Sequence, residues 1–263
     1  MSTDKATDKE KTVVKSADRV LDIIELLASD VEPMSLTDIS RVLDMPASST
    51  YKLLQNLLNR GYLETDRQEK QFRLGYKILE IGTKYTQNTS LISEFQHVAQ
   101  RIVDEINEAV YLSIRSENNI MYIAEKQSTQ PVRFVSHLGM KLPLHATAMG
   151  KMMLSRLNEE ELNRIYPDDQ LGTLTETTLN NRNDLNAQLA SIREEGLAYS
   201  NSEAVQGVQC VAAPIINSQN QMVAAMSISI PKARMSEELW EKAGAMIRQA
   251  AKELGLKIYY QQV

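Results

Sequence analysis

Residues 48–59 read SSTYKLLQNLLN. Wound into a helix at about 100° per residue, this stretch sorts its side chains onto two faces. The apolar face carries Thr50, Leu53, Leu54, Leu57 and Leu58. The polar face carries Ser48, Ser49, Lys52, Gln55, Asn56 and Asn59. The stretch therefore predicts an amphipathic helix with one side in a core.

The polar face of this helix contains no acid, because neither Asp nor Glu occurs between Ala47 and Arg60. Hydroxyl, amide and ammonium groups hydrogen-bond to base edges and phosphates, whereas an ordinary solvated helix face usually includes acidic side chains. The pattern predicts a recognition helix that enters a DNA groove. A merely polar surface helix is the alternative interpretation.

Two more helices are expected before it, over residues 17–29 and 36–43, because apolar side chains recur there at helical spacing. Ser35 stands where it can cap the second of them, with an acid three positions later. Pro46 is expected at the first position of the third helix, where its missing N–H costs nothing, and Gly61 at its end. Three helices in this order indicate a helix-turn-helix.

A β-hairpin is expected after the third helix, with strands over residues 62–65 and 71–74. Its loop is charged, and a hairpin of this kind suits a wing beside DNA. The basic residues Arg67, Lys70 and Arg73 are expected to reach phosphates, although nearby acids dilute their charge and leave a plain surface hairpin as the alternative. Together with Ser48, Ser49, Tyr51, Lys52, Gln55 and Asn56, they are the predicted DNA-binding residues.

A chain of 263 residues exceeds the usual size of one domain, so two folded units are expected. Residues 76–87 return to helical spacing and are too apolar for a free linker, which predicts a dimerisation helix between the units. The expected division is a disordered tail over 1–11, a winged helix-turn-helix over 12–75, a linker helix over 76–90 and an effector-binding domain over 91–263.

The second unit alternates helix-like and strand-like segments, which predicts an α+β domain with an antiparallel sheet. Strands are expected over residues 109–115, 119–125, 132–137, 208–216 and 222–230. Helices are expected over residues 91–107, 146–156, 159–166, 183–195 and 236–254.

Two of these strands present small or polar side chains on one face, namely Cys210 on the first and Ser227 and Ser229 on the second. They are expected either to line a pocket or to make room for a closely packed helix. The segment over 142–151 adds a helix start whose backbone N–H groups would suit a carboxylate. The pattern favours a small organic acid as ligand. Lys151 is expected to be solvated.

Several function classes are excluded or disfavoured by composition. The net charge of −5 argues against indiscriminate coating of nucleic acid, and the single cysteine leaves no disulfide or CxxC zinc site. No signal peptide and no membrane-length apolar run occurs, so a cytoplasmic protein is expected. No cofactor motif or histidine metal motif is present. Catalysis by Cys210 with His145 has no spacing signature, and a redox sensor based on Cys210 is a further alternative.

The sequence resembles the IclR family of bacterial transcription regulators from about Val14 to Leu256. Three separated blocks carry the resemblance. In the head they are SLTDIS (residues 35–40), SSTYKLL (48–54) and GYL (61–63). In the second unit they are LPLHATA (142–148) with GK (150–151), and GVQCVAAP (207–214) with SIS (227–229). The resemblance implies a winged-helix head, a GAF-like effector domain, a repressor or activator of transcription, and homodimers that pair into tetramers on double-stranded operator DNA.

The resemblance also implies a small carboxylate effector such as a keto acid or a sugar acid, and no catalytic residue or cofactor. Some family members bind a metal in this domain, but no residue pattern of this sequence indicates a metal site. Some members carry an acid at the position of Ser200. The pocket residues that it implies are Leu142, Ala148, Met149, Ser200, Cys210, Ser227 and Ser229.

Overall fold

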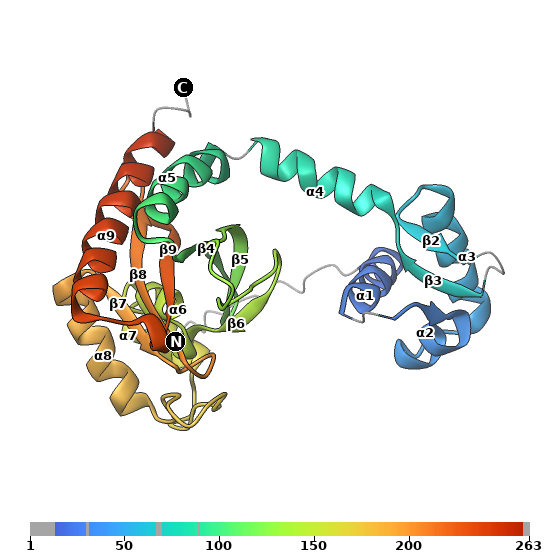
Figure 1. The fold of residues 1–263 in the computed structure, drawn as a ribbon. Helices are drawn as coiled ribbons and strands as arrows, with labels where there is room; N and C mark the ends of the chain where they lie inside the picture. The colour runs from blue at the N-terminus through green and yellow to red at the C-terminus, as the bar shows by residue number, and fades with distance from the viewer. Residues whose placement is uncertain (1–13, 30–31, 67–69, 89, 260–263) are drawn as a thin grey trace, which may run out of the picture. The chain divides into compact units, whose positions relative to one another are not determined.

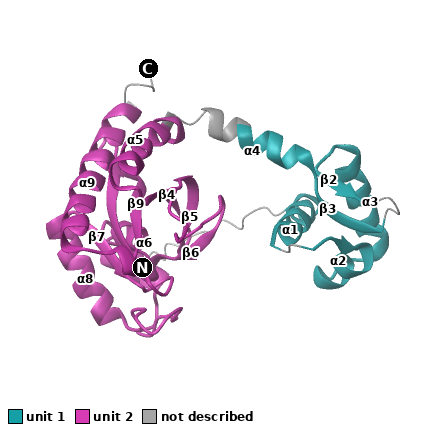
Figure 2. Ribbon diagram, in the orientation of Figure 1, with its two compact units in different colours: residues 1–88 teal, residues 89–263 magenta. Residues whose placement is uncertain are grey.

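The computed structural model describes all residues except 1–13, 30–31, 67–69, 89 and 260–263 (Figure 1). The expected tail over residues 1–11 lies outside the described residues. The chain divides into two compact units, Met1–Asn88 and Thr89–Val263 (Figure 2). Within the described ranges, no helix is both long and apolar enough to cross a membrane.

The first unit is a three-helix head with a small antiparallel sheet, as the amphipathic pattern predicts. Its core contains Ile23, Ile39, Leu54 and Phe72, each from a different element. The strand order is β1-β3-β2. The elements are α1 (Lys15–Ser29), β1 (Met34–Ser35), α2 (Leu36–Val42), α3 (Ala47–Asn59), β2 (Leu63–Thr65), β3 (Gln71–Leu74) and α4 (Tyr76–Asn88). The predicted winged helix-turn-helix fold is confirmed, and the two-residue strand β1 is an addition to it.

Local capping explains where the helices of the head begin and end. Ser35 caps α2, since its hydroxyl oxygen accepts a hydrogen bond of 3.2 Å from the backbone N–H of Asp38. Pro46 lies one position earlier than expected, before the first helical residue, with ψ at 131°. Gly61 follows α3 with φ at +75°, a conformation that disfavours any side chain.

The second unit contains a six-stranded antiparallel sheet with the order β6-β5-β4-β9-β8-β7. The strands are β4 (Ala109–Ser116), β5 (Asn119–Lys126), β6 (Lys141–Pro143), β7 (Ala198–Asn201), β8 (Val208–Ile216) and β9 (Met222–Pro231). The helices are α5 (Ser90–Ile106), α6 (Ala148–Leu154), α7 (Glu159–Ile165), α8 (Arg182–Glu195) and α9 (Glu237–Tyr259), with short 3₁₀ turns η1 (Leu144–Ala146) and η2 (Lys232–Arg234). The predicted α+β class is confirmed.

Helices cover both faces of this sheet (Figure 1). Helices α5 and α9 pack on one face in a cluster that includes Met226 and Ile228 of β9. Helices α6, α7 and α8 belong to a second cluster, which includes Ala225 of the same strand. Neighbouring residues of β9 thus point in opposite directions, as the alternation in the sequence predicts.

The expected strand over residues 132–137 is wrong. The structure has an irregular segment there, and the edge beside β5 is occupied by β6 instead. Side chains hold the segment in place: the Tyr111 hydroxyl donates to the carbonyl of Phe134 at 2.5 Å, and the Ser136 hydroxyl donates to Glu125 at 2.6 Å. These tertiary hydrogen bonds, of which the first satisfies a backbone carbonyl, fix the segment without a ladder, so tertiary contacts override the strand propensity.

Candidate functional site

The polar face of α3 forms an open hollow on the surface of the head. Thr50, Leu54 and Leu57 are buried on the opposite face. The hollow is lined by Tyr51, Lys52, Gln55, Asn56, Asn59 and Arg60. Four of the six residues predicted on this helix therefore lie together. The other two, Ser48 and Ser49, stand in its first turn, Ser48 exposed and Ser49 half-buried.

Sequence reasoning left Asn59 and Arg60 out of the predicted site. The sequence could have indicated Asn59, because this residue belongs to the predicted polar face of the helix. Arg60 lies just past the end of the helix, where its guanidinium is 5.9 Å from the centre of the Tyr62 ring. Both side chains add donors to a surface that contains no acid, which suits a polyanion.

The wing contributes less free charge than expected. Arg73 forms an ion pair with Glu64 at 3.1 Å, although its side chain stays 66% exposed. Lys70 is exposed, and its backbone N–H donates to the carboxylate of Asp66 at 2.8 Å. Arg67 lies outside the described residues. An exposed pair of this kind is weak, so Arg73 can exchange its partner for a phosphate.

The second unit contains a partly open cavity between the sheet and the start of α6. Its volume is about 30 Å³, compared with roughly 10–15 Å³ for one ordered water. The residues that line it are Tyr122, Phe134, Leu142, Thr147, Ala148, Met149, Ser200, Ala204, Val205, Val208, Cys210 and Ser227. Six of the seven predicted effector-binding residues are in this set. The seventh, Ser229, contacts one of them, since its hydroxyl lies 3.1 Å from the sulfur of Cys210.

Strand register brings these residues together from distant parts of the chain. Ser200 on β7 stands opposite Cys210 on β8, and Cys210 stands opposite Ser229 on β9. In the next row, Ser227 stands opposite Tyr111 on β4. Directly opposed residues share a face of the sheet, so the two rows, in which Tyr111 is the large side chain beside small ones, form a floor beneath α6.

Two hydroxyl groups face the cavity without a protein partner. Tyr122 and Ser227 are 5% and 2% exposed. Among the residues that the structure describes, neither hydroxyl makes a hydrogen bond, and both residues line the cavity. Burial raises the pKa of the Tyr122 phenol, so it stays protonated and able to donate. Neither oxygen is among the fully buried unsatisfied atoms of the described residues, so both are accessible from the cavity and can hydrogen-bond to water or to a bound molecule.

The lining of the cavity is neutral, because none of the described residues that form it carries a charge. The Cys210 thiol is protonated at neutral pH, since burial raises its pKa to about 11. Of the backbone N–H groups expected at the start of α6, that of Gly150 is already used, because it donates to the Thr147 hydroxyl at 3.0 Å. A side chain on Gly150 would also collide with the backbone of Leu144.

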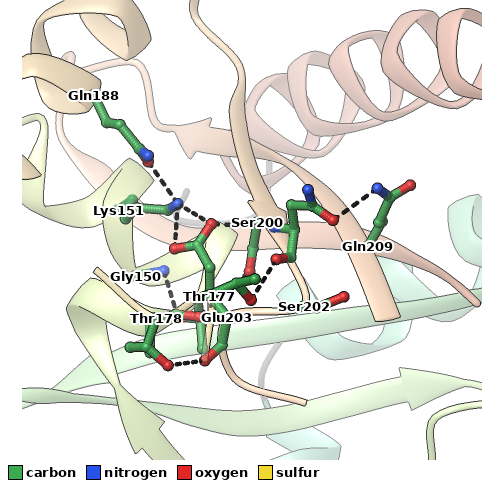
Figure 3. A network of polar contacts seen from close by, with 12 residues as sticks. Gly150, Lys151, Thr177, Thr178, Gln188, Ser200, Ser202, Glu203 and Gln209 are labelled. Atoms are coloured by element: carbon green, nitrogen blue, oxygen red, sulfur yellow. Dashed lines mark hydrogen bonds and ion pairs between the residues drawn. The ribbon is translucent and has the colours of Figure 1, made fainter. Parts of the chain in front are cut away.

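Lys151 is not solvated, contrary to expectation. It is fully buried on α6, and its Nζ lies 2.8 Å from each carboxylate oxygen of Glu203 and 2.7 Å from Oε1 of Gln188 (Figure 3). Its partner is 52 residues away in the sequence. Only the fold brings the two charges together.

Cys210 and His145 do not form a nucleophile and base. Nε2 of His145 lies 2.7 Å from the carbonyl of Gly172, and the Cys210 sulfur is beside Ser229. Within the described part of the chain, no three His, Cys, Asp or Glu residues gather in a metal-binding arrangement. Among the described residues, the geometry provides a partly open cavity and no assembled catalytic group.

His145 should make stability depend on pH. Burial lowers its pKa below the ordinary 6.5, so the unfolded chain takes up the proton first as the pH falls. The free energy of unfolding is therefore expected to decrease as the pH drops below 6.5. His145→Gln, which can still donate to Gly172, should flatten this dependence in urea titrations at several pH values. His137→Gln, at an exposed position, should keep it; equal slopes for both variants would contradict the assignment.

Two family models cover most of the chain. Residues 16–67 match the IclR helix-turn-helix domain, and residues 83–256 match the bacterial transcriptional regulator IclR C-terminal domain. The chain belongs to the IclR family. It is a DNA-binding transcription regulator and not an enzyme.

Individual relatives agree with the family over nearly the full length. The transcriptional repressor AllR of Salmonella typhimurium is 33% identical over 255 residues, with 94% of each chain covered. The transcriptional regulator KdgR of Escherichia coli is 28% identical over 253 residues, with 96% of each chain covered. The crystal structure of Thermotoga maritima IclR has 27% identity and a TM-score of 0.73, covering 93% of this chain and 98% of that one.

Proposed function

We propose that this IclR-family protein is a transcriptional repressor whose C-terminal unit binds a small organic acid, such as a keto acid or a sugar acid, and that binding controls its hold on operator DNA. The observation that carries the proposal is the partly open cavity into which the hydroxyls of Tyr122 and Ser227 point without a hydrogen-bond partner among the described residues. The relative AllR, itself a named repressor, supports the direction of regulation.

The volume and chemistry of the cavity favour a compact effector. A volume of about 30 Å³ holds only about two or three waters, so a keto acid or a sugar acid binds here only if the cavity widens. Aromatic and aliphatic side chains contact its apolar part, while the hydroxyls of Tyr122, Ser200 and Ser227 hydrogen-bond to its oxygens. Since the lining has no cation, a carboxylate here is bound by several neutral donors rather than by one ion pair.

The DNA-binding function is assigned to α3 and the wing, with double-stranded operator DNA as the partner and the cytoplasm as the place of action. Helix α4 supports a homodimer that pairs into a tetramer, because Tyr76, Leu79 and Ile81 are 67%, 72% and 48% exposed. Apolar side chains of this size gain by being covered, and a dimer would place two recognition helices on two half-sites.

A thermal-shift screen of the full-length protein tests the effector assignment. At about 100 times its dissociation constant, a ligand should stabilise the protein by about 2.7 kcal/mol. We expect a keto acid or a sugar acid to do so, and Ser227→Ala to reduce the shift because it removes one hydrogen bond to the ligand. Ser218→Ala, at an exposed serine, is the matched control. The proposal fails if keto, sugar and aromatic acids all leave the melting temperature unchanged.

A further inference from the structure

The loop between β7 and β8, residues 202–208, forms one wall of the cavity. Ala204, Val205 and Val208 line it. The loop begins at Ser202, whose φ is +60°. A residue with a side chain adopts this conformation only where its surroundings hold it. The loop does not adopt this conformation by its own preference. Contacts with its surroundings therefore hold the wall in position.

A buried ion pair supplies the strongest of these contacts. Glu203 is the second residue of the loop, and its two carboxylate oxygens lie 2.8 Å from Nζ of Lys151. The side chains are 7% and 0% exposed. Lys151 belongs to α6, whose first residues Ala148 and Met149 line the cavity from another side. The pair thus connects two parts of the boundary of the cavity.

Three threonines hold the backbone over residues 201–203, where β7 passes into this loop. Figure 3 labels two of them, Thr177 and Thr178. The Thr178 hydroxyl donates to the carbonyl of Glu203 at 2.6 Å, and the Thr175 hydroxyl donates to the carbonyl of Ser202 at 2.7 Å. The Thr177 hydroxyl donates to the carbonyl of Asn201 at 3.0 Å. Side-chain and backbone contacts together leave the start of the wall little freedom to move.

We propose that the Lys151–Glu203 ion pair is the positioning element of the cavity, fixing the wall over residues 202–208 and so setting the width of the cavity without touching its occupant. Neither residue is among the described residues that line the cavity. Moving the wall requires separating two charges in a low-dielectric interior, which is unfavourable. The inference rests on the proposed function in one respect, namely that the occupant of the cavity is an effector.

Cys210 provides a test that needs no ligand. It lines the same cavity and is the single cysteine of the chain. The full-length protein is alkylated under native conditions with iodoacetamide and with the bulkier N-ethylmaleimide. Both reagents react with the thiolate, so the ratio of their rates cancels any change in thiol pKa and reports the width of the opening. Glu203→Gln should raise the maleimide-to-iodoacetamide ratio several-fold.

A matched control separates wall movement from general destabilisation. Ile247→Ala creates a cavity in the core on the other face of the sheet and should keep the wild-type ratio. If Glu203→Gln does not fold, the double variant Lys151→Met/Glu203→Leu, which leaves no buried charge, should show the same raised ratio. A folded variant with the wild-type ratio, or a ratio raised equally by Ile247→Ala, overturns the inference. An effector screen without a hit would overturn the proposed function alone.

Discussion

Replacing Lys151 by methionine is expected to lower the free energy of unfolding of the C-terminal unit by about 3–5 kcal/mol. The lysine is fully buried, and Glu203 is 7% exposed. Removing the ammonium leaves the carboxylate without its counter-charge in a largely buried position. Oε1 of Gln188 also loses the donor that it accepts from at 2.7 Å. Few single substitutions cost this much, and those that do usually strand a buried charge or open a large cavity.

The double variant Lys151→Met/Glu203→Leu is the control for this result. Replacing both partners by apolar residues leaves no charge to solvate, and such exchanges are often neutral. The double variant should therefore recover most of the stability that Lys151→Met loses. It does not restore the ion pair that holds the loop. Urea unfolding followed by circular dichroism measures both variants, with the two units fitted separately. If the single and double variants unfold at the same urea concentration, the unpaired charge of Glu203 is not the cause of the lost stability.

The Lys151–Glu203 pair also shows where sequence reasoning ends. The helix that carries Lys151 follows from local spacing, but its partner is 52 residues away, and no local signal connects the two. A lysine on a helix is usually solvated, so the general expectation was wrong at this position. Long-range pairing becomes visible only when the sheet and the helices are in place.

The cavity was partly predictable for the same reason. Alternation along β8 and β9 places Cys210, Ser227 and Ser229 on one face, and this alternation is visible in the sequence. Tyr122 and Phe134 were missed, because one sits on a strand with ordinary aromatic content and the other on a segment expected to be a strand. Irregular backbone held by side-chain hydrogen bonds has no periodic pattern to detect.

The head was the most predictable part, because its decisive features are local. Capping at Ser35, the apolar faces of the helices and the two strands of the wing all depend on residues close in sequence. The shift of Pro46 by one position is the usual uncertainty at a helix end. The absence of acids on α3 concerns chemistry rather than packing, so its meaning must be tested with DNA.

Replacing Gln55 or Asn56 by alanine should weaken specific DNA binding by about 1–3 kcal/mol each, if either side chain makes a bidentate contact with a base. Both lie in the open hollow on α3, with Asn56 exposed and Gln55 half-buried. An amide can donate and accept on the edge of an adenine, so its loss removes discrimination between bases while phosphate contacts remain. Fluorescence anisotropy on a duplex selected from a random library, against a scrambled duplex, measures the change.

Lys52→Ala should behave differently from the amide variants, and the contrast identifies the role of each side chain. An ammonium that contacts phosphate weakens binding to both duplexes alike and lowers the slope of log affinity against log salt by about 1. Gln219→Ala, at an exposed amide of the C-terminal unit, is the control and should change neither quantity. The recognition role of α3 is refuted if both amide variants keep the wild-type preference for the selected duplex. In that case the acid-free face of α3 contacts DNA without distinguishing bases, and another element of the head must recognise the base sequence.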